Sequence, residues 1–219
     1  MRNEIFKRIL SSIALIPIAL FFIIKGSFLF TFFISICFLI ALYEWHMMSK
    51  KKTYNIFGII FLLISFYSVF LLRNYDLCCD YPEPGLMYFL LVTITCVFTD
   101  IGGYIFGKIF KGPKLTKISP NKTYAGMFGG LFLSIISINL FVNYNSDLNL
   151  FFTFEIFIFV ILISLVSQIG DILISYFKRK SKIKNTGMLI PGHGGLLDRV
   201  DGMLFAYPFA YILILIGFI

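Results

Sequence analysis

The chain has 219 residues, of which 59% are hydrophobic, and a formal net charge of +8. Its mean hydropathy of +0.91 excludes an ordinary water-soluble domain, because a soluble fold of this size cannot bury so much apolar surface. We attribute the positive charge to loops that contact membrane lipids and set orientation, and we do not expect a nucleic-acid partner. The composition predicts an integral membrane protein with a single polytopic domain over residues 1–219.

Seven apolar runs are long enough to cross a bilayer as helices, since about 20 apolar residues span its hydrocarbon core. They cover residues 8–24, 28–45, 54–72, 86–107, 124–142, 151–175 and 203–219. We therefore predict an all-α membrane protein with about seven transmembrane helices. Residues 1–90 would hold the N-terminal spans, 95–204 the chemical motifs and 203–219 the last span.

Positive charge alternates between the segments that connect these runs. Of the 19 Lys and Arg residues, all but Lys25 and Arg73 lie at or before the start of the first run or follow the second, fourth or sixth run. Cytosolic segments carry such an excess of Lys and Arg. The alternation predicts a cytosolic N-terminus and a C-terminus on the opposite side. The long basic segments 107–123 and 176–202 would then face the cytosol together.

Two acidic residues lie inside apolar runs, where they are costly to insert and usually mark function. Asp100 lies in the fourth run, and Asp171 lies near the end of the sixth. Asp171, Ser175 and Lys178 recur at helical spacing, so they share one helix face. A structural carboxylate paired with a loop lysine is the alternative interpretation for each aspartate.

Glycines, acids and cations are concentrated after the sixth run. Residues 191–195 read Pro-Gly-His-Gly-Gly, a sequence that exposes backbone N–H groups and can approach phosphates closely. Asp198 and Asp201 follow with i, i+3 spacing on one helix face. Carboxylates beside cations suit Mg²⁺ together with a substrate phosphate. We therefore predict a metal–phosphate site between Asp171 and Gly202.

The basic segment before the fifth run contains Ser119-Pro-Asn-Lys-Thr123, in which hydroxyls and Lys122 could bind phosphates. His193 could bind a phosphate or order its loop, and the sequence favours neither role.

These motifs resemble those of the phosphatidate cytidylyltransferase family, also called CDP-diacylglycerol synthases. The resemblance covers roughly residues 95–204. It is carried by the residues 119–123, by Ser175-Tyr-Phe-Lys-Arg179 with Lys184, and by the segment 191–201.

Two positions depart from the family pattern. Asn185 stands where the family usually has Asp, and Ala125 stands where it usually has Glu. Neither departure affects the three acidic positions that match.

The resemblance implies the reaction CTP + phosphatidate → CDP-diacylglycerol + pyrophosphate, in a bacterial cell membrane with the site facing the cytosol. The catalytic residues would be Asp171, Asp198, Lys178, Arg179 and Arg199. The substrate-binding residues would be Lys122, Ser119, Thr123, Ser175, Lys184, His193, Gly194, Gly195 and Asp100. The metal ligands would be Asp171, Asp198 and Asp201.

The expected cofactor is Mg²⁺, as one or two ions, with a monovalent cation such as K⁺ as a further candidate. The expected partners are CTP, phosphatidate, the bilayer and a second copy of the chain.

Two other functions are compatible with parts of the pattern. One is another membrane enzyme that uses CTP, such as a polyprenol kinase or a cytidylyltransferase for a different lipid phosphate. The other is a transporter with intramembrane carboxylates, for which the absence of a visible sequence repeat is unfavourable.

Overall fold

The computed structural model describes residues 2–50, 52–75, 84–116, 118–144, 153–187, 189 and 194–219, with only the backbone for 2–12, 14 and 140–144. These residues form the helices α1 (Arg2–Lys25), α2 (Ser27–Ser49), α3 (Asn55–Arg73), α4 (Pro84–Phe110), α5 (Tyr124–Tyr144), α6 (Phe154–Lys180), α7 (Leu197–Val200) and α8 (Met203–Leu215). Each predicted apolar run overlaps one of the helices α1 to α6 and α8, of which α8 has only 13 residues, and α7 is an additional short helix. The all-α prediction is confirmed for the described residues.

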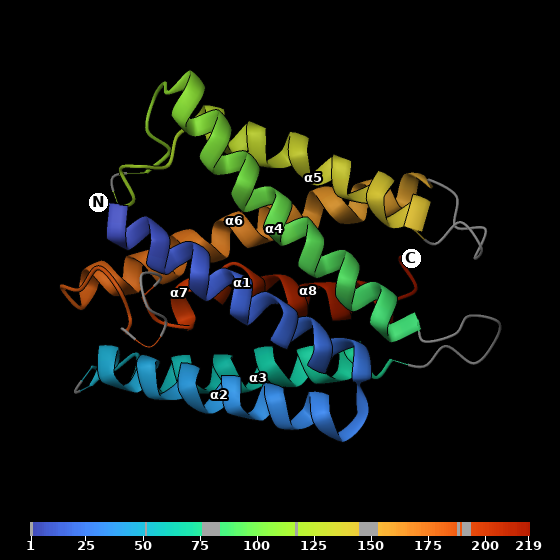
Figure 1. The fold of residues 1–219 in the computed structure, drawn as a ribbon. Coiled ribbons are helices and arrows are strands. Elements are labelled where there is room, and N and C mark those ends of the chain that lie inside the picture. The colour runs from blue at the N-terminus through green and yellow to red at the C-terminus, as the bar shows by residue number, and fades with distance from the viewer. Residues whose placement is uncertain are drawn as a thin grey trace.

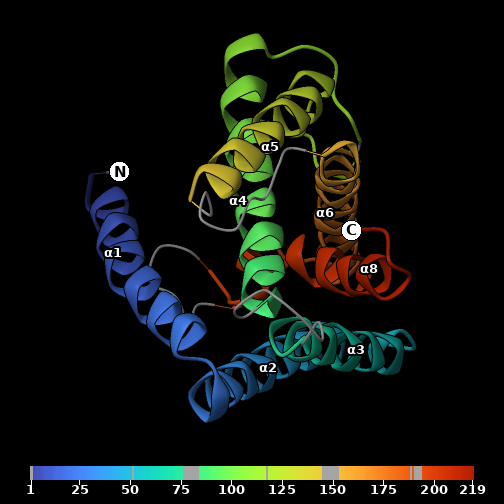
Figure 2. The same ribbon diagram turned by 90° about the vertical axis from the view of Figure 1, so that its right-hand side faces the viewer.

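The long helices form two groups that α8 joins. Figures 1 and 2 show α4, α5 and α6 on one side and α2 and α3 on the other, with α8 packed between α6 and α3. One apolar cluster includes Phe30, Phe89 and Phe159, and a second includes Trp45 and Leu62. Helix α1 packs on α2 and stands at the margin of the bundle.

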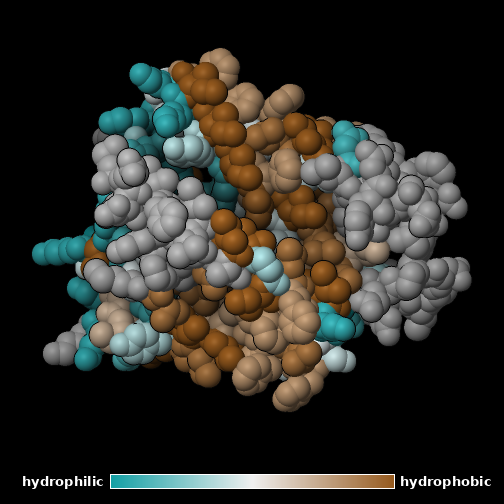
Figure 3. Space-filling view, in the orientation of Figure 1, coloured by the Kyte–Doolittle hydropathy of each residue, from teal (hydrophilic) through white to brown (hydrophobic). Residues whose placement is uncertain are grey.

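Polar segments gather at one end of the bundle, which we call the loop end. It holds the α2–α3 turn, the α4–α5 loop and the segment between α6 and α7, and α1 begins there (Figure 1). The C-terminus lies at the opposite end (Figure 1). Hydrophilic side chains cluster at the loop end, and a broad hydrophobic band crosses the middle of the bundle (Figure 3).

Four helices, α2, α3, α4 and α6, are long and apolar enough to cross a membrane. The shorter apolar segments Leu15–Lys25, Tyr124–Asn139 and Met203–Leu215 belong to α1, α5 and α8. The architecture is that of an integral membrane protein, in which helices satisfy their own backbone hydrogen bonds.

Helices α4 and α5 approach closely because glycines line their interface. A Cβ atom on Gly102 would lie 2.4 Å from the carbonyl oxygen of Gly129, and one on Gly126 would lie 2.7 Å from that of Gly103. Small residues allow such contacts between membrane helices. The close contact brings the loop between α4 and α5 to a defined place at the loop end.

Buried hydroxyl groups connect α4 to α6 and to α5. Thr99 on α4 donates to Ser164 Oγ on α6 at 2.8 Å, and the hydroxyls of Thr95 and Ser137 lie 3.2 Å apart. All four side chains are buried. These contacts place Asp100, the next residue after Thr99, on the side of α4 near α6.

The loop end of α6 is held by aromatic residues of α2 and of the α2–α3 turn. Trp45 Nε1 donates to the carbonyl oxygen of Asn55 at 3.1 Å, and the hydroxyls of Tyr54 and Ser181 lie 2.7 Å apart. The Trp45 ring meets the edge of Phe177, with centroids 5.4 Å apart. The last turns of α6 are therefore fixed against α2 and α3.

The close packing of α4 on α5 can be tested with two neighbouring glycines. We expect Gly102→Ala to destabilise the bundle by about 1–3 kcal/mol, because the new methyl group would meet backbone atoms that cannot move independently. Gly103→Ala is the matched control, since its Cβ would be 3.8 Å from the nearest atom, the carbonyl oxygen of Gly126. Thermal unfolding in detergent measures both, and equal unfolding temperatures would contradict the packing described.

Candidate active site

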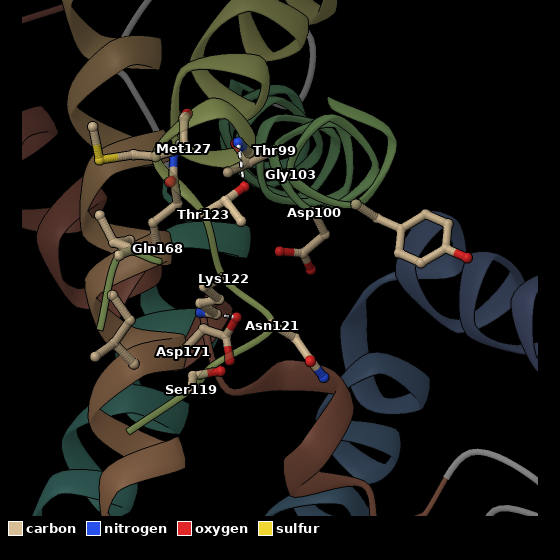
Figure 4. A pocket seen from close by; sticks show the side chains of 14 residues that line it. Thr99, Asp100, Gly103, Ser119, Asn121, Lys122, Thr123, Met127, Gln168 and Asp171 are labelled. Atoms are coloured by element: carbon tan, nitrogen blue, oxygen red, sulfur yellow. Dashed lines mark hydrogen bonds and ion pairs between the residues drawn. The ribbon is translucent and has the colours of Figure 1, made fainter. Parts of the chain in front are cut away.

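A cavity of about 260 Å³ lies between α4, α5, α6 and the α4–α5 loop. Its lining comes from all four segments (Figure 4), and α4, α6 and the loop supply the polar side chains of Asp100, Ser119, Lys122, Gln168 and Asp171. Three of these side chains carry charge, so the cavity suits a polar, charged ligand rather than an apolar one.

Lys122 and Asp171 form an ion pair across this cavity. Their side chains are 24% and 28% exposed, and Asp100 reaches toward the same space from α4 (Figure 4). A partly exposed ion pair contributes only about 0–1 kcal/mol. Exchanging either partner for a substrate phosphate or a cation would therefore cost little.

The loop that presents Lys122 is folded by its own backbone. Leu115 N donates to the carbonyl oxygen of Lys122 at 2.8 Å, and Lys122 N donates to that of Ser119 at 3.0 Å. Thr123 Oγ1 accepts from Gly126 N at 3.1 Å and so caps α5. The predicted phosphate-binding residues Ser119, Lys122 and Thr123 all line the cavity, but Thr123 also has this structural role.

A second charged centre surrounds Lys178, two helical turns after Asp171 on α6. Its Nζ atom lies 2.9 Å from Asp198 Oδ1 and 3.7 Å from Asp201 Oδ2. The three side chains are 8–13% exposed. Lys178 and the two acids of the C-terminal motif therefore lie together.

Asp198 is fully engaged by the protein. Its Oδ2 atom accepts from the backbone N–H groups of Thr186 at 2.9 Å and Gly195 at 3.1 Å, in addition to the Lys178 contact at Oδ1. Burial opposes ionisation of Asp198, but the hydrogen bonds and the charge of Lys178 outweigh it and lower the pKa of this carboxyl group. Asp198 is thus a stable anion that organises the loop around it.

Asp201 is in a different electrostatic state. Burial raises its pKa well above the ordinary value, and the negative charge of Asp171, which is within hydrogen-bonding reach, raises it further against the opposing effect of Lys178. Two adjacent carboxylates in one pocket favour a shared proton or a cation between them. Asp201 therefore connects the Lys178 centre to the cavity that contains Asp171.

The remaining predicted residues take different positions. Ser175 is buried on α6, and Arg199 is close enough to Asp100 for their charges to interact. Arg179 is exposed and donates to the carbonyl oxygen of Ile183 at 3.1 Å. Lys184 is exposed. His193 lies outside the described residues.

The two described glycines of the motif have packing roles. Gly194 has a φ of +91°, a conformation that favours glycine, and a Cβ there would lie 2.9 Å from Asp198 Oδ2. The N–H of Gly195 is used by Asp198. The predicted phosphate contacts of these glycines stay a prediction.

Sequence reasoning missed Glu44, which lies on α2, distant in sequence from both motifs. Glu44 is 3% exposed, and its carboxylate accepts hydrogen bonds from Thr186, Leu196 and Leu197. The signal was an acid inside an apolar run, the pattern used for Asp100 and Asp171. Its neighbours Tyr43 and Trp45 are typical of the lipid headgroup level, a pattern that hides the acid between them.

The fold and these two centres define an integral membrane protein with acids and lysines gathered at one end of its helices. A model of the cytidylyltransferase family matches residues 6–81 and 57–216. The chain belongs to this family.

Relatives with assigned names agree with that membership. Proteins named phosphatidate cytidylyltransferase from Rickettsia prowazekii and Rickettsia typhi are each 34% identical over 214 residues, covering 94% of this chain and 90% of the relative. One of the same name from Staphylococcus saprophyticus is 40% identical over 137 residues, covering 61% of this chain and 51% of the relative. The resemblance stated from the motifs is confirmed.

The electrostatic role of Asp198 predicts how acid affects stability. Because its folded-state pKa is lowered, its stabilising contribution is complete above the ordinary pKa of 3.8 and is lost as the pH falls through the folded value. We expect Asp198→Asn to lower the free energy of unfolding by about 1–3 kcal/mol at neutral pH. The difference in unfolding free energy between this variant and wild type should become smaller in acid. Thermal unfolding across pH checks this, with Glu155→Gln as an exposed control on α6. A difference that stays constant down to about pH 3 would contradict the lowered pKa.

Proposed function

We propose that this chain is a phosphatidate cytidylyltransferase, which converts CTP and phosphatidate to CDP-diacylglycerol and pyrophosphate. The observation that carries the proposal is the meeting of Lys122, Asp171, Lys178 and Asp201 at the polar end of a membrane-sized helix bundle. Such a site suits a substrate that has a lipid portion and a phosphate. Family membership and the names of the relatives support the particular reaction.

The reaction needs positioning and charge neutralisation more than proton transfer. A phosphatidate oxygen, already anionic at neutral pH, attacks the α-phosphorus of CTP. A new P–O bond forms, and the bond from the α-phosphorus to the bridging oxygen of pyrophosphate breaks. Catalysis of such a step comes mainly from orientation and from fixed charges around the phosphates. Lys122, in the open cavity, is placed to neutralise phosphate charge, and Arg199 is near enough to contribute.

The donor set fits Mg²⁺. The carboxyl groups of Asp171 and Asp201 lie together, where two negative charges would repel each other. Asp100 borders the cavity that Asp171 lines. Among the described residues, no three His, Cys, Asp or Glu side chains form a complete metal site. Mg²⁺ is commonly held by one or two carboxylates plus substrate phosphates, so two carboxylates are enough to propose a site. When bound, the ion would neutralise phosphate charge. We assign Asp171 and Asp201 as its first ligands, with Asp198 holding Lys178 beside them. A second Mg²⁺ or a K⁺ ion is a further proposal on the same acids.

We also propose seven membrane spans with the N-terminus and the loop end in the cytosol of a bacterium, and the C-terminus outside the inner membrane. The concentration of Lys and Arg in the segments of the loop end supports this orientation. The opposite placement of the two termini agrees with an odd number of spans (Figure 1). A homodimer is proposed from the family resemblance alone, and cross-linking in membranes would test it.

An assay with labelled CTP, phosphatidate and Mg²⁺ tests the reaction. We expect wild-type membranes to form a CDP-lipid, and Asp171→Asn or Lys122→Met to lower the rate by about 10²-fold or more, as losses of charged groups at reacting centres do. Glu155→Gln should retain full activity, because it changes an exposed acid in the first turn of α6. A phosphorylated alcohol as the product, or no CDP-lipid at all, would refute the assignment.

Reporter fusions test the orientation. Alkaline phosphatase, which folds actively outside the cytosol, should be active when fused after Ile219 and inactive when fused after Lys180. A green fluorescent reporter should give the reverse pattern. Activity of the phosphatase after Lys180 would contradict a cytosolic loop end.

A further inference from the structure

Glu44 is a buried acid that binds the segment between α6 and α7, residues 181–196, which we call the polar segment. Its Oε2 atom accepts from Thr186 Oγ1 at 3.0 Å and from Leu197 N at 2.8 Å, and its Oε1 atom accepts from Leu196 N at 2.9 Å. The two N–H groups come from the start of α7, where helical donors lack partners within the helix. One carboxylate from α2 thus accepts hydrogen bonds both from Thr186 and from the start of α7.

The polar segment is shaped around this carboxylate. A Cβ atom on Gly187 would lie 2.7 Å from Glu44 Oε1, and one on Gly195 would lie 2.4 Å from Glu44 Oε2. Any side chain at either position would displace the acid. The two glycines leave space for Glu44 on both sides of the segment.

Two of the residues that contact Glu44 also contact Asp198. Thr186 donates its hydroxyl to Glu44 and its backbone N–H to Asp198. Gly195, packed on Glu44, donates its N–H to Asp198 as well. Two of the three hydrogen bonds to Asp198 therefore depend on a segment that Glu44 holds. Asp198 in turn fixes Lys178 at 2.9 Å.

We infer that Glu44 is a positioning residue for the cytidylyl transfer, an inference that rests on the proposed function. It acts through Thr186 and the start of α7. By holding this segment on α2, it keeps Asp198 on Lys178, and so keeps the Lys178 ammonium between Asp198 and Asp201. A buried acid in the N-terminal half of the chain would then control the geometry of the C-terminal motif.

Two substitutions separate the size of Glu44 from its charge. Glu44→Gln keeps the shape but replaces one acceptor oxygen with an NH₂ group, which faces N–H or O–H donors. Glu44→Ala removes the side chain entirely. Glu155→Gln is the control, because it removes an exposed acid at the other end of the bundle.

The first measurement is the mobility of the segment. A nitroxide is attached at position 189, where Leu189 is 59% exposed, after Leu189→Cys in a background without the four native cysteines. We expect the spectrum to show a mobile label in Glu44→Ala, intermediate mobility in Glu44→Gln and no change in Glu155→Gln. No substrate is needed for this measurement.

The second measurement is steady-state kinetics with CTP, phosphatidate and Mg²⁺. We expect kcat/KM to fall by about 10²-fold in Glu44→Ala, the size of loss that small misplacements of catalytic groups produce. The KM for CTP should rise as well. A merely structural defect would lower the amount of folded enzyme, and hence the maximal rate, but leave the KM for CTP unchanged.

The two measurements distinguish the possible failures. An immobile label in Glu44→Ala, or a mobile label with unchanged kinetics, overturns the positioning role. A reduced maximal rate with an unchanged KM for CTP also overturns it. If wild type forms no CDP-lipid, the proposed function fails, and the catalytic role of Glu44 fails with it, while the label still decides whether Glu44 anchors the segment.

Discussion

The geometry of the site depends on one buried ammonium group. Lys178 Nζ lies between Asp198 and Asp201, and without it two carboxylates would face each other and Asp171 in a partly dehydrated pocket. Uncompensated charges in such surroundings cost several kcal/mol. The same helix carries Asp171 two turns earlier, so α6 aligns both the pairing lysine and the open carboxylate.

The three aspartates consequently differ in role despite their similar surroundings. Asp198 is surrounded by donors and organises the loop, whereas Asp171 borders the cavity and Asp201 lies beside Asp171 with fewer donors of its own. A carboxylate with occupied oxygens positions other groups, and one with free oxygens can bind an incoming cation. This division explains how one short motif can both fold a loop and provide metal ligands.

The packing of the helices also explains an exception in the charge pattern. Arg73, one of two basic residues outside the predicted cytosolic segments, is buried and donates from Nε to the carbonyl oxygen of Ile23 at 3.0 Å. It thereby binds the last turn of α1, where helical carbonyl groups lack partners and favour a cation. A Cβ on Gly26 in the adjoining turn would lie 2.7 Å from its guanidinium group. Arg73 is therefore a structural residue of the α1–α2 turn rather than an orientation signal.

The sequence by itself determined the helices, the end of the bundle that gathers the polar segments, and the family. These features depend on local hydrophobicity and on motifs of contiguous residues, which need no knowledge of packing. Only the tertiary structure decided that Lys122 pairs with Asp171, that Asp198 is occupied by Lys178, Thr186 and Gly195, and that Glu44 holds the polar segment. Residues 44 and 197 are far apart in the chain, so no spacing rule relates them. Their contact exists because α2 and the polar segment meet at the loop end, where the buried carboxylate and the free N–H groups satisfy each other.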